Sequence, residues 1–174
     1  MKISSLRKFL VTLIQQELKV PAVWSNQNHP KLKPPFVTLW LYGFKEKAQA
    51  ETRLLNNTET LVTPNEAVLE LQLYGREGTF PCDELENFVA RLSTDSVLNE
   101  CASAGVSFFD SEPVQDLTGL LDDRQTFECK AVVELHIRYM YTVEDDISSI
   151  DEVEIEGHYA DVTQKFSVKR NKEA

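Results

Sequence analysis

The residues best suited to chemistry by type and spacing are two adjacent aspartates, Asp122 and Asp123. Neighbouring carboxylates can bind a hard cation or share acid–base work. Arg124 follows them directly, and this order is typical of a turn in which aspartates accept backbone N–H groups and the arginine forms a local ion pair. We therefore predict a turn over residues 119–124. An enzyme would have to combine Asp122 and Asp123 with a further carboxylate from the acidic C-terminal segment.

The other reactive side chains do not form a recognised catalytic or metal-binding pattern. The three histidines and three cysteines are widely separated, with no zinc-ligand spacing; they are His29, His136, His158, Cys82, Cys101 and Cys129. Their spacing predicts reduced thiols rather than a disulfide framework. The segment from Gly75 to Gly78 lacks the GK[ST] ending of a phosphate loop and predicts a strand-to-helix turn. The sequence thus predicts no catalytic residue, no cofactor and no metal site.

Seven carboxylates, with no basic residue among them, occupy the segment from residue 144 to 156. They are Glu144, Asp145, Asp146, Asp151, Glu152, Glu154 and Glu156. The run lacks the glycine and the alternate ligands of an EF-hand loop, so it indicates a solvated face, an anion-repelling wall, or one side of an interface with a basic partner. The formal net charge of −10 also disfavours adhesion to DNA, since adhesion needs Lys or Arg to neutralise phosphates.

Hydrophobic periodicity then predicts the elements that position these residues. Leucines and phenylalanines at helical spacing favour a helix over residues 5–18, capped by Ser4 or Ser5, and a second helix over 82–92. Three strands are expected at residues 36–44, 68–74 and 127–141. The first is apolar at nearly every position and predicts a strand covered on both faces. The last alternates over an unusual length, which indicates a strand that bends or one that projects beyond its own domain toward a neighbour.

Weaker patterns predict the smaller elements. They are two extended arms within residues 45–66 joined at Asn56-Asn57, a short helix near 97–101, short extended pieces at 106–109 and 113–117, and a strand at 153–156. The chain of 174 residues fits one domain, with residues 143–174 as an acidic C-terminal extension. The element order predicts an α+β fold, a mostly antiparallel sheet with two main helices packed on one face. No apolar run is long enough to cross a bilayer, and the N-terminus does not read as a signal peptide.

Several of these patterns together resemble the neck and tail-terminator proteins of tailed bacteriophages. The resemblance includes the N-terminal helix, the Pro-rich lead into Phe36, the stretch from Leu69 to Gly75 before a helix, and the ending from Val153 to Gly157. Its most specific part precedes the long alternating strand and consists of Asp116, Leu117, Thr118, Gly119, Leu120, Leu121, Asp122, Asp123 and Arg124.

This resemblance implies a structural protein of the virion, assembled in the host cytoplasm, without enzymatic activity or cofactor. Such proteins form a ring, commonly hexameric, that caps the tail-tube protein, stops its polymerisation and offers a docking surface to the head-side connector protein. DNA would pass through the ring without specific binding, and no membrane is involved. The acidic segment leaves a second interpretation open, a soluble assembly chaperone or adaptor that binds a basic partner and stays monomeric.

Overall fold

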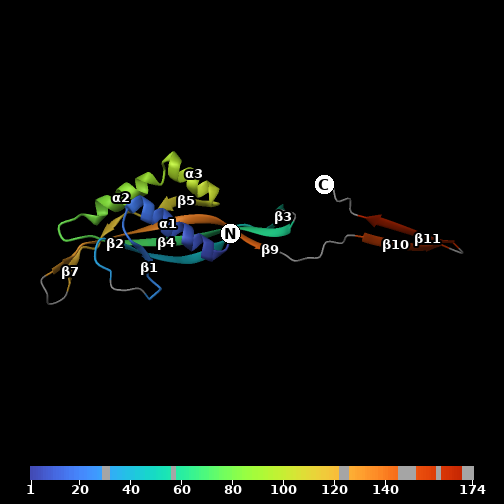
Figure 1. The fold of residues 1–174 in the computed structure, drawn as a ribbon, viewed down its shortest axis with the longest axis horizontal. Coiled ribbons are helices and arrows are strands. Elements are labelled where there is room, and N and C mark those ends of the chain that lie inside the picture. Colours follow the sequence, from blue (N-terminus) through green and yellow to red (C-terminus); the bar gives the residue numbers. More distant parts are fainter. Residues whose placement is uncertain (29–31, 56–57, 122–125, 145–151, 160–161, 170–174) are drawn as a thin grey trace.

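The computed structural model describes residues 1–28, 32–55, 58–121, 126–144, 152–159 and 162–169 (Figure 1). The helices are α1 (Ile3–Leu18), α2 (Pro81–Arg91) and α3 (Asp95–Ser103). The longer strands are β2 (Phe36–Glu46), β4 (Thr58–Tyr74), β5 (Val106–Ser111), β9 (Lys130–Glu144), β10 (Glu152–Tyr159) and β11 (Val162–Lys169). The shorter strands are β1 (Ala22–Trp24), β3 (Glu51–Leu55), β6 (Gln115–Asp116), β7 (Gly119–Leu121) and β8 (Thr126–Glu128). The fold is α+β, as the sequence predicted.

One seven-stranded sheet organises the chain, in the order β1-β2-β4-β9-β5, with β3 paired to β4 and β6 paired to β9. The pair β4–β9 forms its centre and runs antiparallel from Thr60 opposite Glu144 to Tyr74 opposite Lys130. All pairs in this sheet are antiparallel except β1 with β2. The expected arms therefore exist as β3 and the start of β4, whereas Asn56-Asn57 lies outside the described residues.

All three helices lie on the same face of this sheet (Figure 1). Strand residues alternate between faces, so one side of β4 and β9 packs under the helices. The six residues predicted to be buried there are buried: Leu69, Leu71, Leu73, Val133, Leu135 and Ile137. The helices contribute to the same core through Leu6, Leu10 and Leu13 of α1 and through Leu85 and Phe88 of α2.

Several local predictions were wrong. Helix α1 begins at Ile3 after Lys2, and neither Ser4 nor Ser5 caps it, because both lie inside its first turn. Strand β2 is not covered on both faces, because the helices cover only one: Trp40, on the other face, is 47% exposed. Residues 119–121 form strand β7 rather than a turn, because β8 supplies a hydrogen-bonding partner that the local pattern does not reveal.

The predicted strand at residues 127–141 is divided, with β8 ending at Glu128 and β9 continuing past Tyr141 to Glu144. The predicted strand at 153–156 lies within β10. Strand β11 was not predicted; it pairs antiparallel with β10 to form a separate two-stranded hairpin, called here the C-terminal hairpin.

Candidate functional site

The stretch from Asp116 to Thr118 forms a compact turn that leads from β6 into β7. The Asp116 carboxylate accepts the backbone N–H of Thr118 at 2.8 Å, and the Thr118 hydroxyl accepts the backbone N–H of Lys130 at 3.3 Å. Hydrogen bonding by the Thr118 side chain, and then by its backbone N–H, lowers the pKa of Asp116. A charged carboxylate already engaged in this way fixes the chain rather than serving as a base.

The turn and the β7–β8 hairpin lie at one end of the molecule, close to the start of α2. A depression of about 440 Å³ there is lined by Phe80, Cys82, Asp116 and Thr118, among others. Phe80 is 74% exposed, and Leu117 is also exposed, so this end presents apolar side chains to solvent. We call this region, residues 77–83 with 116–121, the β7 end.

The thiol in this depression is not prepared for catalysis. Burial raises the pKa of Cys82, and the nearby Asp116 carboxylate raises it further, so the thiol stays protonated at neutral pH. Among the residues that the structure describes, no group of three His, Cys, Asp or Glu side chains is placed to hold a metal ion. The sequence candidates for cation binding or acid–base chemistry lie outside the described residues; they are Asp122 and Asp123, with the neighbouring Arg124.

The acidic run is divided between two strands. Glu144 is the last residue of β9, whereas Glu152, Glu154 and Glu156 occupy alternate positions of β10. Asp145, Asp146 and Asp151 lie outside the described residues. In Figure 1 the hairpin and the β7 end lie at opposite ends of the long axis.

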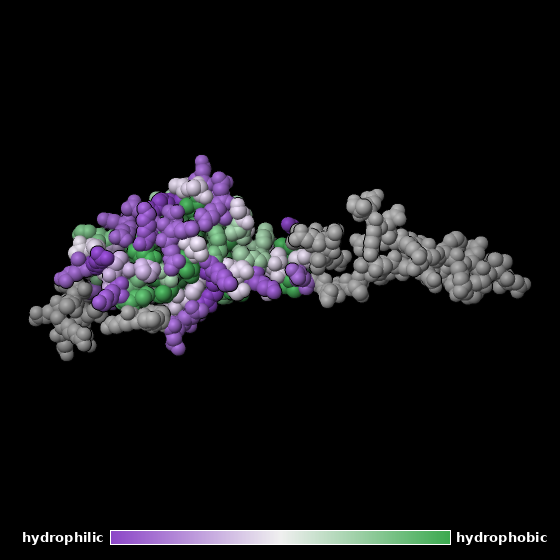
Figure 2. Space-filling model, in the orientation of Figure 1, coloured by the Kyte–Doolittle hydropathy of each residue, from purple (hydrophilic) through white to green (hydrophobic). Residues whose placement is uncertain are grey.

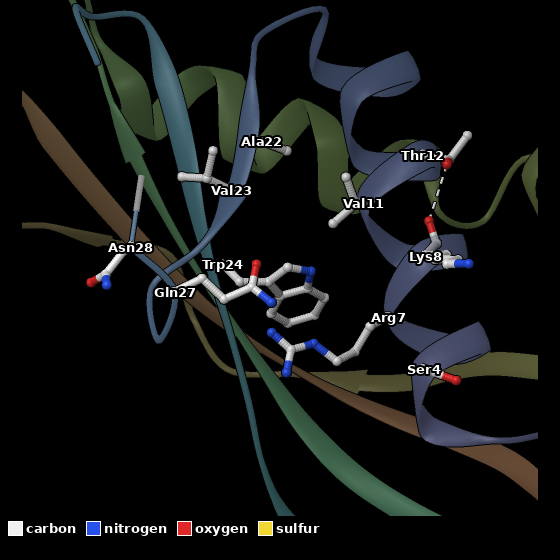
Figure 3. Close-up of a pocket in the computed structure, with 10 residues that line it drawn as sticks. All are labelled: Ser4, Arg7, Lys8, Val11, Thr12, Ala22, Val23, Trp24, Gln27 and Asn28. Atoms are coloured by element: carbon white, nitrogen blue, oxygen red, sulfur yellow. Dashed lines mark hydrogen bonds between the residues drawn. The ribbon is translucent and has the colours of Figure 1, made fainter. Parts of the chain in front are cut away.

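A basic groove between α1 and β1 was missed by the sequence analysis (Figure 3). It has a volume of about 770 Å³ and is lined by Arg7, Lys8, Val11, Val23 and Trp24, among others. The guanidinium carbon of Arg7 lies 4.1 Å from the centre of the Trp24 ring, and Arg7 Nη2 donates to Asn26 Oδ1 at 3.0 Å.

A signal for this groove was present in the distribution of charge. The first 35 residues contain six Lys or Arg and one Asp or Glu, a formal charge of +5, whereas the rest of the chain has twelve against twenty-seven, −15. We call the surface around Arg7, Lys8 and Trp24 the α1–β1 groove.

The far end of the sheet carries a third exposed feature. Beyond the helices, β3, the start of β4 and the end of β9 continue as a projecting arm, with Leu61, Met140 and Val143 exposed on it. Figure 2 shows mostly hydrophilic side chains over the helices, and hydrophobic ones both in the middle of the body and toward this part of the sheet. We call residues 51–64 with 140–144 the sheet arm.

Comparison with known proteins is consistent with a structural role. The chain matches the family described as phage neck terminator protein over residues 3–161. Among curated proteins, no relative matches at a significant level. No helix in the described part of the chain has the length and apolar character needed to span a membrane. The matched range takes in the whole seven-stranded sheet and its helices as well as β10, and the chain therefore belongs to the phage neck terminator protein family, a family of structural proteins of the virion neck.

Proposed function

We propose that the protein assembles into a ring, a hexamer, that ends the tail tube and joins it to the head-side connector protein. Membership of the neck terminator family supports a structural place in the neck. The observation that carries the ring is the sheet arm, because its apolar side chains project beyond the helices that cover the rest of the core. A contact between this arm and a different surface on the next copy is head-to-tail, and its repetition closes into a ring when the rotation per subunit divides a full turn.

In this proposal the β7 end is the surface that binds a neighbouring protein of the virion. The described family-like residues from Asp116 to Leu121, together with exposed Phe80, form the docking surface for the tail-tube protein or the connector. This surface lies at one end of the long axis, away from the C-terminal hairpin (Figure 1). Assembly takes place in the host cytoplasm, where both partners are made.

DNA passes through the ring without specific binding. The acidic residues from Glu144 to Glu156 supply negative charge that repels phosphates, and the net charge of −10 per copy acts in the same sense. Residues 143–174 act as an extension to the domain rather than as a domain of their own.

The experiment is to measure the mass of the purified protein in solution and to image it by negative-stain microscopy. We expect annular particles with about six times the mass of a single chain. A Val143→Asp variant should lose them, because it places a charge on the apolar sheet arm. The matched control is Leu98→Asp on α3, which is 48% exposed and lies on a helix outside the arm. A protein that remains monomeric with tube protein present would contradict the ring and favour a chaperone or adaptor.

A further inference from the structure

The face of the sheet that carries no helix exposes an indole ring beside two carboxylates. Trp40 of β2 lies opposite Glu70 of β4, and Glu70 lies opposite Glu134 of β9, so the three form one row across adjacent strands. The Trp40 side chain is 47% exposed, and its ring centre lies 4.7 Å from that of Tyr42. We call Trp40, Glu70 and Glu134 the open-face row.

The open-face row carries negative charge that the described part of the chain does not neutralise. Like charges directly opposite each other on neighbouring strands destabilise a sheet. Among the described residues, no Lys or Arg forms an ion pair with Glu70 or Glu134, and Glu70 instead accepts a hydrogen bond from the neutral side chain of Gln72. A depression of about 390 Å³ at this place is lined by Glu70, Glu112 and Glu134, among others. A cationic side chain from another molecule is therefore favoured on this surface.

The α1–β1 groove has the complementary properties. Arg7 and Lys8 give it positive charge, and Val11, Val23 and the Trp24 ring give it an apolar wall (Figure 3). Its volume of about 770 Å³ lies within the range of pockets that take a whole small ligand, so one indole ring fits. An aromatic side chain with carboxylates beside it matches both the wall and the charge of the groove.

The two surfaces lie on opposite faces of the sheet. Helix α1 packs on the inner face, where it shares the core with Leu39. Trp40 is the next residue along β2 and therefore points from the other face. Each copy thus presents the open-face row on one side and the groove on the other, and the two cannot meet within one chain.

We propose that Trp40 of one copy inserts into the α1–β1 groove of the next copy, with Lys8 of that groove beside Glu70 and Glu134. The inserted indole leaves water against the apolar wall, and the lysine relieves the repulsion between the two opposed carboxylates. The contact joins two different surfaces, so its repetition closes a ring when the rotation per subunit divides a full turn. This inference rests on the proposed ring and names a second contact between its subunits, in addition to the sheet arm.

Disulfide crosslinking between two full-length variants tests the contact directly. Lys8→Cys and Glu70→Cys are made in separate chains in a Cys82→Ser background, because Cys101 and Cys129 are buried. Mixed and oxidised, the two should give a disulfide-linked pair. The control replaces Lys8→Cys by Glu100→Cys, which is exposed on α3 outside the groove and should give no pair with Glu70→Cys.

Two crosslinking results would overturn the proposal. One is a yield of the Lys8–Glu70 pair no higher than that of the control. The other is a bond that forms at high dilution within a single chain carrying both cysteines, because the two surfaces would then meet in one copy.

Charge exchange provides the second measurement. Lys8→Glu alone, and Glu70→Lys alone, should each raise the concentration needed for self-association at least about tenfold, since each places like charges together between copies. The two changes combined in one chain should restore association. Lys19→Glu, at an exposed position outside the groove, and Glu100→Lys are the matched controls and should have little effect. Circular dichroism checks that each variant is folded.

Glu70→Lys also separates the contact from a role in folding. Within one chain it places a lysine opposite Glu134, so it should raise the thermal unfolding midpoint of the dilute protein while it weakens association. Weaker association together with a lowered midpoint would assign the effect to folding and contradict the contact.

Removal of the inserted ring is the third measurement. Trp40→Ala should weaken self-association at least about tenfold, whereas Phe80→Ala, which removes an exposed ring at the β7 end, should leave it unchanged in the purified protein. Rings that ignore the changes at Lys8, Trp40 and Glu70 would refute this contact and leave the ring standing. Crosslinked chains that grow without closing would refute the ring and leave the contact standing.

Discussion

At the scale of single residues, Leu135 is the clearest test of the packing. It is fully buried beneath the helices and lies opposite Leu69 at the centre of the β4–β9 pair. We expect Leu135→Ala to lower the free energy of unfolding by about 2–5 kcal/mol, through lost burial and the cavity left behind. Urea denaturation measures this loss in the free energy of unfolding. Leu98→Ala, at an exposed position of α3, should cost less than about 0.5 kcal/mol. A loss below about 1 kcal/mol for Leu135→Ala would contradict the assigned inner face.

The ion pairs of Glu66 should make the free energy of unfolding depend on pH. Its carboxylate lies 2.8 Å from Lys47 Nζ and 2.6 Å from Arg138 Nη2. Hydrogen bonds from Lys47 and then Arg138 lower the pKa of Glu66 below its ordinary value. A carboxyl with a lowered native pKa contributes its full stabilisation above the unfolded pKa, about 4.3, and loses it as pH falls through the native value.

The measurement is the free energy of unfolding from pH 7 down to pH 3 for the natural protein and for Glu66→Gln. We expect the difference between the two to be largest at pH 7 and to shrink in acid. Glu100→Gln, at an exposed position of α3, is the control for the loss of one negative charge. A difference that grows as pH falls would show that Glu66 is not stabilised by its two cations.

At the scale of elements, the turn between β4 and α2 depends on Gly75. A Cβ built on this residue would lie 2.4 Å from Thr79 Oγ1 and 2.6 Å from Pro81 Cγ. Because the proline ring cannot rotate away, Gly75→Ala should displace the start of α2 and cost about 1–3 kcal/mol. In Gly119→Ala the nearest atom would be 3.9 Å away, so this control should be close to neutral. Thermal unfolding compares the two, and equal effects would contradict the close approach.

Elements also show how far the sequence could predict the structure. The alternating residues of β4 and β9 and the leucine spacing of α1 are local patterns, and they predicted both the elements and their buried faces. Strand β1 has only three residues and exists because its backbone pairs with β2, as when Ser25 N–H donates to Leu39 O at 2.9 Å. Such partners are set by the tertiary fold and leave no local pattern.

The same reasoning applies to the candidate site. The family-like stretch beginning at Asp116 was identified from the sequence, but its strand β7 depends on pairing with β8. The α1–β1 groove was missed because Arg7, Lys8 and Trp24 are brought together only by the packing of α1 against β1. In the sequence they appear as ordinary residues of a helix and a loop. The excess of basic residues before Phe36 was the available signal.

At the scale of the whole molecule, we expect the body of the chain to set the thermal stability without a contribution from the C-terminal hairpin. We expect a chain ending at Asp151 to keep the thermal unfolding midpoint of the full chain, because the main contacts of the described hairpin are those between its own strands, β10 and β11. Calorimetry measures the midpoint of the truncated and the full-length chain. A midpoint lowered by several degrees would show that the hairpin stabilises the body of its own chain.

The placement of the two tryptophans gives the molecule an intrinsic optical reporter for each surface. Trp24 is 8% exposed under Arg7 at the α1–β1 groove, whereas Trp40 is 47% exposed on the sheet face that carries no helix. Acrylamide should therefore quench mainly the red-shifted emission of Trp40 in the free chain. A partner that covers the open sheet face would protect this emission, whereas an occupant of the groove would change the blue-shifted emission of Trp24. Fluorescence alone, without any label, can thus report which face of the subunit is occupied as the neck assembles.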